Sequence, residues 1–122
     1  MGLDMYLMKK IPNNEDVELI YWRKANQVFN WFDRNCANNA IENCVPVPVS
    51  TYDLMNLLKD VNAVLEDNSK AKELLPTTSG FFFGSTDYNE WYFDDLKYTK
   101  EKLEEVLCDI TEDDELEFYA WW

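Results

Sequence analysis

Apolar residues alternate with other residues at both ends of the chain. The alternating residues are Leu3, Met5 and Leu7 near the start, and Leu116, Phe118, Ala120 and Trp122 in the closing segment ELEFYAWW. A period of two is typical of β-strands that bury one face. We therefore predict strands over residues 2–8 and 115–122, and we expect them to pair, because pairing ties down both termini.

Three longer segments have apolar residues at steps of three and four, which predicts amphipathic helices. The first spans residues 21–36, the second begins after Ser50 and the third begins after Asp87. Ser50 and Asp87 are the expected N-caps, because their side-chain oxygens can accept hydrogen bonds from the first turn. A shorter helix over residues 69–75 ends before Pro76. The apolar stripes are Trp22, Ala25, Phe29, Phe32 and Cys36 in the first helix, Leu54, Leu57, Leu58, Val61, Val64 and Leu65 in the second, and Tyr92, Leu96, Thr99, Leu103, Val106 and Ile110 in the third.

Two short extended segments are expected between the helices. CVPVPV, residues 44–49, alternates valine with proline, and proline cannot donate a hydrogen bond within a sheet, so this is an edge strand or a polyproline-like piece. Three phenylalanines stand between Gly80 and Gly84, which we interpret as a short buried strand. Residues 17–20 fit either a short strand or the first turn of the first helix. That helix carries a polar face composed of Arg23, Asn26, Asn30 and Arg34.

These elements predict an α+β fold: a small, mainly antiparallel sheet with paired N- and C-terminal strands, packed against three to four helices. The alternative is a mostly helical domain with a peripheral hairpin. The chain has 122 residues, 47% of them hydrophobic, which is typical of a single domain over residues 1–122. No window approaches the roughly 18 apolar residues of a membrane span, and the N-terminus has no secretory pattern. We therefore expect a cytoplasmic protein.

Charge and composition narrow the functional classes. The net charge is −13, of which residues 1–60 contribute −2 and residues 61–122 contribute −11. Such a field repels nucleic acids and anionic membranes and favours partners with basic surfaces. The chain contains no histidine, which removes the commonest general base, the Ser-His-Asp triad and histidine-ligated metals. We expect no catalytic residues, no metal site and no cofactor, and therefore no enzyme.

Three sequence blocks resemble a family of small proteins encoded by bacteriophages and prophages. The blocks are GLDMYL at residues 2–7, YWRKANQVFNWF at residues 21–32 and LLPTTSGFFFGSTDYNEWYFDDLKYT at residues 74–99. Family members often carry a histidine after YWRKAN, where this chain has Val28 and Phe29. The family has no settled activity, so the resemblance implies a phage setting and little chemistry. In that setting, small acidic proteins without enzyme motifs often inhibit host machinery, including CRISPR effectors.

The acidic residues of the third helix form the first candidate interface. Asp87, Asp94 and Glu101 recur every seven residues, and rows of carboxylates can substitute for phosphates in an arginine-lined nucleic-acid groove. The alternative is a solvated helix face neutralised locally by lysines. The predicted partner-binding residues, including two aromatic anchors, are Asp87, Glu90, Trp91, Asp94, Asp95, Glu101, Glu104, Glu105 and Trp122.

The block YWRKAN supplies a second candidate site. Arg23 and Lys24 are adjacent bases beside aromatic residues in a chain with few positive charges. A guanidinium next to aromatic rings suits a phosphate or a base, so we interpret Tyr21, Trp22, Arg23, Lys24 and Tyr88 as a nucleotide-binding set. The alternative is that Trp22 belongs to the core and Arg23 pairs with the surplus of acids.

Three functions follow from these patterns. The first is a phage-encoded acidic protein that inhibits a host defence complex, such as a CRISPR effector, by presenting its acidic helix to a basic surface. The second is a protein that binds and sequesters a nucleotide or cyclic-nucleotide messenger. The third is an accessory protein that assembles into homo-oligomers or virions. None of the three involves direct binding to nucleic acid or to a membrane.

Overall fold

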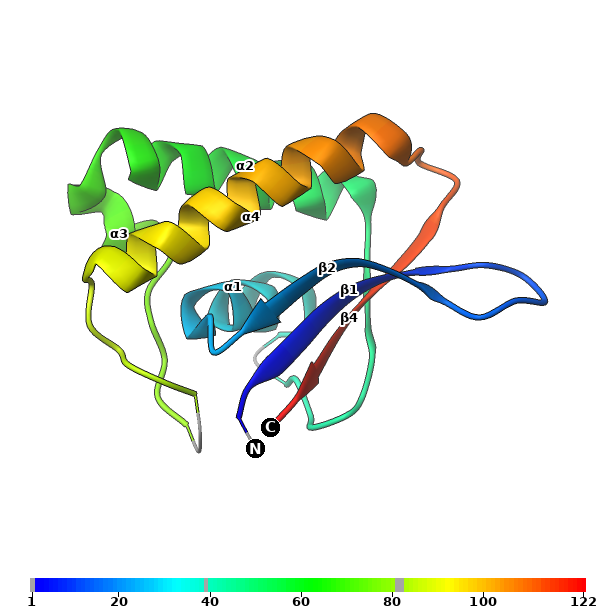
Figure 1. The fold of residues 1–122 in the computed structure, drawn as a ribbon, viewed down its shortest axis with the longest axis horizontal. Coiled ribbons are helices and arrows are strands. Elements are labelled where there is room, and N and C mark those ends of the chain that lie inside the picture. The colour runs from blue at the N-terminus through cyan, green and yellow to red at the C-terminus, as the bar shows by residue number, and fades with distance from the viewer. Residues whose placement is uncertain (1, 39, 81–82) are drawn as a thin grey trace.

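A four-stranded antiparallel sheet forms the base of the molecule, and the helices pack over one of its faces (Figure 1). The computed structural model describes residues 2–38, 40–80 and 83–122. The strand order is β2-β1-β4-β3, so the fold is α+β. The elements are β1 (Asp4–Lys10), β2 (Val17–Arg23), α1 (Asn26–Cys36), β3 (Val47–Val49), α2 (Thr51–Glu66), the 3-10 helix η1 (Asn68–Lys70), α3 (Ala71–Leu74), α4 (Glu90–Asp109) and β4 (Glu115–Trp121).

The N- and C-terminal strands pair as predicted. β1 and β4 run antiparallel in an unbroken register from Asp4 opposite Trp121 to Lys10 opposite Glu115, and the two chain ends lie next to each other (Figure 1). The residues that point toward the helices are buried, namely Leu3, Met5 and Leu7 at the start of the chain and Leu116, Phe118 and Ala120 in β4. The short strand β3, with Pro48 at its centre, lies at the edge of the sheet beside β4, where a missing N–H is tolerated.

The buried faces of α2 and α4 follow the predicted periodicity. All six residues of the predicted stripe on the longest helix, Tyr92 to Ile110, are buried. In α2, Leu54, Leu57, Val61 and Val64 are buried, while Leu58 and Leu65 are partly buried at the edge of the core. The two helices pack against each other and cross above the sheet, and α1 lies behind it (Figure 1). Ser50 caps α2 as predicted, because its side chain accepts from the N–H of Asp53 while the Asp53 carboxylate accepts from the N–H of Ser50.

Replacing Ser50 with alanine is expected to lower the free energy of unfolding by about 1 kcal/mol, because α2 loses its capping box. Urea denaturation followed by circular dichroism measures the change. Ser79→Ala, in an exposed part of the segment before α4, is the control and should unfold like the parent protein. Equal stability of the two variants would contradict a stabilising role for the cap.

The predicted start of the first helix is wrong. Tyr21, Trp22 and Arg23 belong to β2, where they pair with Tyr6, Met5 and Asp4, and α1 begins only at Asn26. Trp22 has the spacing of the helical stripe although it lies in β2. It is buried with the stripe because the inner face of β2 and the buried face of α1 contribute to the same core. The expected polar face is also wrong in part, since Asn26 is 1% exposed.

The predicted start of the longest helix is wrong as well. Asn89 is the N-cap of α4, and its side chain accepts a hydrogen bond from the N–H of Tyr92 at 3.2 Å. Asp87 lies before the helix, where its N–H donates to the Ser85 hydroxyl at 3.0 Å. Local pairing within this turn therefore replaces the expected capping role of Asp87.

The predicted strand from Gly80 to Gly84 is not found in the residues that the structure describes. Phe81 and Phe82 lie outside those residues, and Gly80, Phe83 and Gly84 are not in a strand. The N–H of Phe83 instead donates to the carbonyl of Gly80 at 3.2 Å. Phe83 is nevertheless buried, with its ring centroid 5.0 Å from that of Phe29.

Candidate functional site

A cleft of about 320 Å³ lies between the end of β2, the start of α1 and the start of α4. It brings together residues that the sequence assigned to two separate sites. Arg23 and Lys24, from the predicted ligand site, line the cleft with Asp87, Trp91 and Asp95 from the predicted acidic interface. The cleft therefore has basic, acidic and aromatic groups on its walls.

Two residues with positive φ shape the backbone of the cleft. Lys24 has φ 55° and Gly84 has φ 86°, a region that suits glycine. A Cβ on Gly84 would stand 3.1 Å from the Cβ of Lys24, so the two segments touch at this point. The N–H of Lys24 also donates to the carbonyl of Leu3 at 2.6 Å, which fixes the end of β2 against the N-terminus.

Asn26 connects the cleft to the long segment that precedes α4. Its side-chain amide donates to the carbonyls of Phe83 at 3.0 Å and Ser85 at 2.9 Å, and its oxygen accepts from the N–H of Thr78 at 3.1 Å. One buried side chain thus holds three points of the segment between α3 and α4. This role could not be predicted from the sequence, where the only signal is a small amide directly after YWRKA.

Asp95 is the one acid of this region with a clearly perturbed pKa among the residues that the structure describes. Burial raises its pKa to about 6, with a smaller contribution from Asp94, and a hydrogen bond from Gln27 works in the opposite direction. Gln27 is itself buried and donates to the carbonyl of Tyr92 at 3.2 Å. A carboxyl with a shifted pKa in a cleft is a feature of functional sites and also of buried structural groups.

Replacing Asp95 with asparagine is expected to stabilise the protein at neutral pH by roughly 1 kcal/mol, after allowance for partial solvent screening. The folded protein holds this proton up to a pKa of about 6, whereas the unfolded chain loses it near the ordinary value of 3.8. The contribution of Asp95 to stability therefore falls as pH rises through that window, and the penalty is fully present above it. Urea unfolding at several pH values should show that Asp95→Asn is more stable than the parent above the window and no more stable below it.

Glu104→Gln on the exposed side of α4 provides the control for that experiment, since it removes one charge without relieving a buried carboxyl. We expect it to leave the dependence of stability on pH close to that of the parent protein. A constant difference between parent and Asp95→Asn at all pH values would contradict the assignment of the raised pKa to Asp95.

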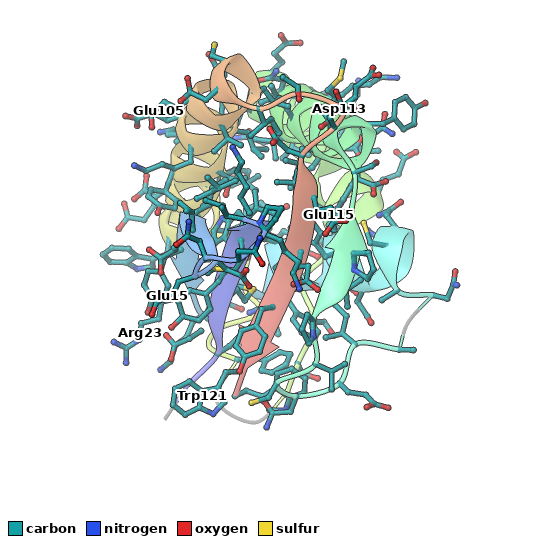
Figure 2. All side chains as sticks on the ribbon, turned by 90° about the vertical axis from the view of Figure 1, so that its right-hand side faces the viewer. Glu15, Arg23, Glu105, Asp113, Glu115 and Trp121 are labelled. Atoms are coloured by element: carbon teal, nitrogen blue, oxygen red, sulfur yellow. The ribbon has the colours of Figure 1, made fainter. Side chains whose placement is uncertain are left out.

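Five exposed acids lie on the outer side of α4, and Lys97 and Lys100 are exposed beside them. Successive residues of a helix are rotated by about 100°, and this rotation places the acids opposite the buried stripe of α4. All five are exposed: Glu90, Asp94, Glu101, Glu104 and Glu105. Asp87 precedes the helix and Asp95 turns toward the cleft, so neither belongs to this face. Figure 2 shows Glu105 near the end of α4, far from the end of the sheet that carries Trp121.

The structure separates the residues of the predicted nucleotide site. Trp22 is 2% exposed and its indole N–H donates to the Thr99 hydroxyl at 2.9 Å, so it is a core residue. Tyr21 points to the other side of the sheet, where its hydroxyl donates to Asp4. Tyr88 accepts a hydrogen bond from the N–H of Thr77 at 3.1 Å and does not line the cleft. Of that set, only Arg23 and Lys24 remain together in the cleft.

Trp122 is partly buried and packs against the core, so it is not a fully exposed anchor. Its ring packs at right angles on Phe29 and Phe83, with centroids 5.4 and 5.6 Å away. Its backbone N–H and carbonyl both bond to the side chain of Asn43. The exposed tryptophans are Trp91, at 69%, and Trp121, at 55%. Of the terminal pair, Trp121 is therefore the more exposed, whereas the sequence analysis named Trp122 as the anchor.

Within residues 2–38, 40–80 and 83–122, no three His, Cys, Asp or Glu side chains come together in a way that could hold a metal ion. No helix of that part of the chain is long and apolar enough to cross a membrane. Comparisons of the chain with protein-family models, with curated proteins and with solved structures found no match.

Proposed function

We propose that this protein is a non-enzymatic interaction protein that binds a basic surface of a partner protein through the outer face of α4. The observation that carries the proposal is Trp91, an indole 69% exposed at the start of that helix. It stands next to Glu90 and one turn from Asp94, and it borders the cleft. A large aromatic residue beside a pocket and flanked by charges is typical of an interface anchor.

The electrostatics of α4 favour a basic partner. The helix carries seven acids and three lysines. Among the described residues, the only ion pair within the helix is Lys102 with Glu105, at 3.8 Å. Apart from Asp95, which turns toward the cleft, the other carboxylates of the helix are exposed without an ion pair in the part of the chain that the structure describes, and they add to a net charge of −13. A surface of this kind accelerates association with a positively charged patch and loses affinity as salt rises.

The phage resemblance of the three sequence blocks suggests what the partner is. We propose that the partner is a host defence complex, such as a CRISPR effector, that has an arginine-lined nucleic-acid groove. The acidic face of α4 would occupy this groove in place of the nucleic acid. The spacing of carboxylates along a helix of 20 residues supports this use.

Affinity capture from lysates of the host cell tests the proposal. The parent protein, a variant with Glu101→Gln, Glu104→Gln and Trp91→Ala, and a control with Glu42→Gln and Glu66→Gln serve as baits; the two control positions are exposed and lie outside α4. We expect the parent and the control to retain the same nucleic-acid-binding protein, released at high salt, and the α4 variant to lose it. Retention of that protein by the α4 variant, or capture of no basic protein by the parent, would contradict the proposal.

A second function is favoured by one observation: Arg23 and Lys24 both line the 320 Å³ cleft beside the indole of Trp91. This combination suits a nucleotide, whose base stacks on the indole and whose phosphate meets the two bases. Asp87 and Asp95 on the same walls disfavour a ligand with a large negative charge. A melting shift with a nucleotide or cyclic dinucleotide that disappears in Arg23→Ala would support this function, and a flat response across the panel would exclude it.

A further inference from the structure

The sheet face that points away from the helices carries a row of three tyrosines. We call this surface the outer sheet face. Tyr6 in β1 lies opposite Tyr21 in β2 and opposite Tyr119 in β4, so the three side chains cross the sheet at the same level. Their ring centroids are 5.2 Å apart between Tyr6 and Tyr21 and 6.0 Å apart between Tyr6 and Tyr119. The described helices pack on the opposite face, so this row is open to solvent on its outer side.

A groove of about 460 Å³ runs along the outer sheet face. Its apolar walls are Tyr6, Met8, Pro46, Tyr119 and Trp121. Trp121 is 55% exposed and projects from the end of β4, as Figure 2 shows, with Arg23 near the same end of the sheet and Glu115 farther along β4. Two rings and an indole on adjacent positions form a surface on which planar groups can stack.

Every charged residue that lines the groove is a carboxylate: Asp16, Glu18 and Glu117. Glu18 and Glu117 lie opposite Met8 on either side, so acids flank the aromatic row. Lys10 approaches one oxygen of Glu117 at 3.5 Å, and Arg23 lies opposite Asp4 at the end of the sheet. The hydrogen bond to Asp4 and burial raise the pKa of Tyr21 to about 12, and burial and the charge of Asp4 raise that of Tyr6.

We infer that the outer sheet face binds an extended peptide segment that carries arginine. The guanidinium is planar, stacks on tyrosine and tryptophan rings, and pairs with carboxylates in the same plane. The groove offers both features within a few residues, namely Tyr119 and Trp121 for stacking and Glu18 and Glu117 for pairing. An extended peptide also matches the strand spacing, because its alternate side chains meet successive positions along the sheet.

Charge excludes the other occupants of such a face. Aromatic residues on an antiparallel sheet also suit stacked RNA bases, but three lining carboxylates and a net charge of −13 oppose a phosphate backbone. A second copy of the chain would bring the same acids face to face. Lysine can pair with the acids, but its compact ammonium lacks the planar stacking surface.

Isothermal titration calorimetry with synthetic peptides tests the inference. The probe is a blocked peptide in which three arginines alternate with glycines, and the matched probe has lysines in their place. We expect the arginine peptide to bind the parent protein with a dissociation constant on the order of 10–100 µM at low salt, and the lysine peptide to bind about tenfold more weakly. Tyr119→Ala and Trp121→Ala should each weaken the arginine peptide by about tenfold.

Two controls separate this surface from the acidic face of α4. Glu101→Gln with Glu104→Gln removes two charges far from the groove and should leave arginine-peptide binding unchanged, whereas Glu18→Gln with Glu117→Gln should weaken it. Trp121 is exposed, so its alanine variant reports on binding even if Tyr119→Ala fails to fold.

Several outcomes would overturn the inference: equal affinity for both peptides, equal loss in the α4 control, tight binding of a labelled single-stranded RNA, or a concentration-dependent dimer that Trp121→Ala abolishes. Capture of a host protein depends on α4, whereas peptide binding depends on the outer sheet face. A negative result in one experiment therefore does not affect the interpretation of the other.

Discussion

Replacing Phe118 with alanine is expected to lower the free energy of unfolding by about 4 kcal/mol. Phe118 lies in the middle of β4 and is fully buried. Its ring stacks on Phe32 in α1, with centroids 4.1 Å apart and an interplanar angle of 15°, and Trp22 and Phe29 lie at 6.3 and 6.5 Å. Alanine would remove contacts with α1 and β2 at once and leave a cavity between rigid elements that cannot close around it.

Urea denaturation at pH 7 measures this loss, and Phe118→Leu is the matched control. Leucine keeps most of the volume, so we expect a loss of about 1.5 kcal/mol for it. Both variants should unfold with the same dependence on urea concentration as the parent, because the surface exposed on unfolding hardly changes. A loss below about 2 kcal/mol for the alanine variant would mean that α1 moves to fill the space.

Periodicity was sufficient to predict the buried side of the two long helices. In α4, each predicted core residue from Tyr92 to Ile110 is buried, because a helix that packs on one side must repeat its apolar residues every three or four positions. Alternation was equally reliable at the two ends of the chain, where Met5 and Leu7 of β1 and every second residue of β4 are buried. These patterns are local, so one sequence contains all the information that they need.

Element boundaries near the site could not be predicted in the same way. Tyr21, Trp22 and Arg23 are strand residues because β1, the preceding strand, supplies their partners. The helical spacing of apolar residues over 21–36 does not reveal this pairing, on which strand formation depends. The same holds for the cleft, whose walls come from β2, α1 and α4. The sequence predicted Arg23 and Trp91 as members of different sites, because nothing in their separate segments shows that the segments meet.

The outer sheet face illustrates a signal that the sequence did contain. Tyr6, Tyr21 and Tyr119 are each the outward residue of a strand, and the correct pairing of β1 with β4 already places Tyr6 beside Tyr119. Tyr21 was missed because the first helix was extended back over it. A surface of this type can therefore be predicted once the strand register is known. The roles of Asn26 and Gln27, in contrast, can be recognised only from the three-dimensional contacts.

Replacing Asn26 with alanine is expected to lower the free energy of unfolding by about 3 kcal/mol, roughly 1 kcal/mol for each of three hydrogen bonds. Asn26 is 1% exposed, so solvent has little direct access to its side-chain amide. The carbonyls of Phe83 and Ser85 and the N–H of Thr78 would lose their partner together. Urea denaturation measures the global loss, and limited proteolysis should show faster cleavage between α3 and α4 than in the parent protein.

Two related variants make this prediction specific to the three-point connection. Asn30→Ala, one turn later in α1, removes a single bond to the carbonyl of Pro76, and it should cost about 1 kcal/mol. Asn26→Asp keeps an acceptor for the N–H of Thr78, but its carboxylate faces two carbonyl oxygens. The pKa of this carboxyl is therefore raised in the folded state. The stability of the variant should fall as pH rises toward neutrality. If Asn26→Ala costs no more than Asn30→Ala, the segment before α4 is held by its other contacts, and the wall of the cleft at Gly84 and Ser85 does not depend on Asn26.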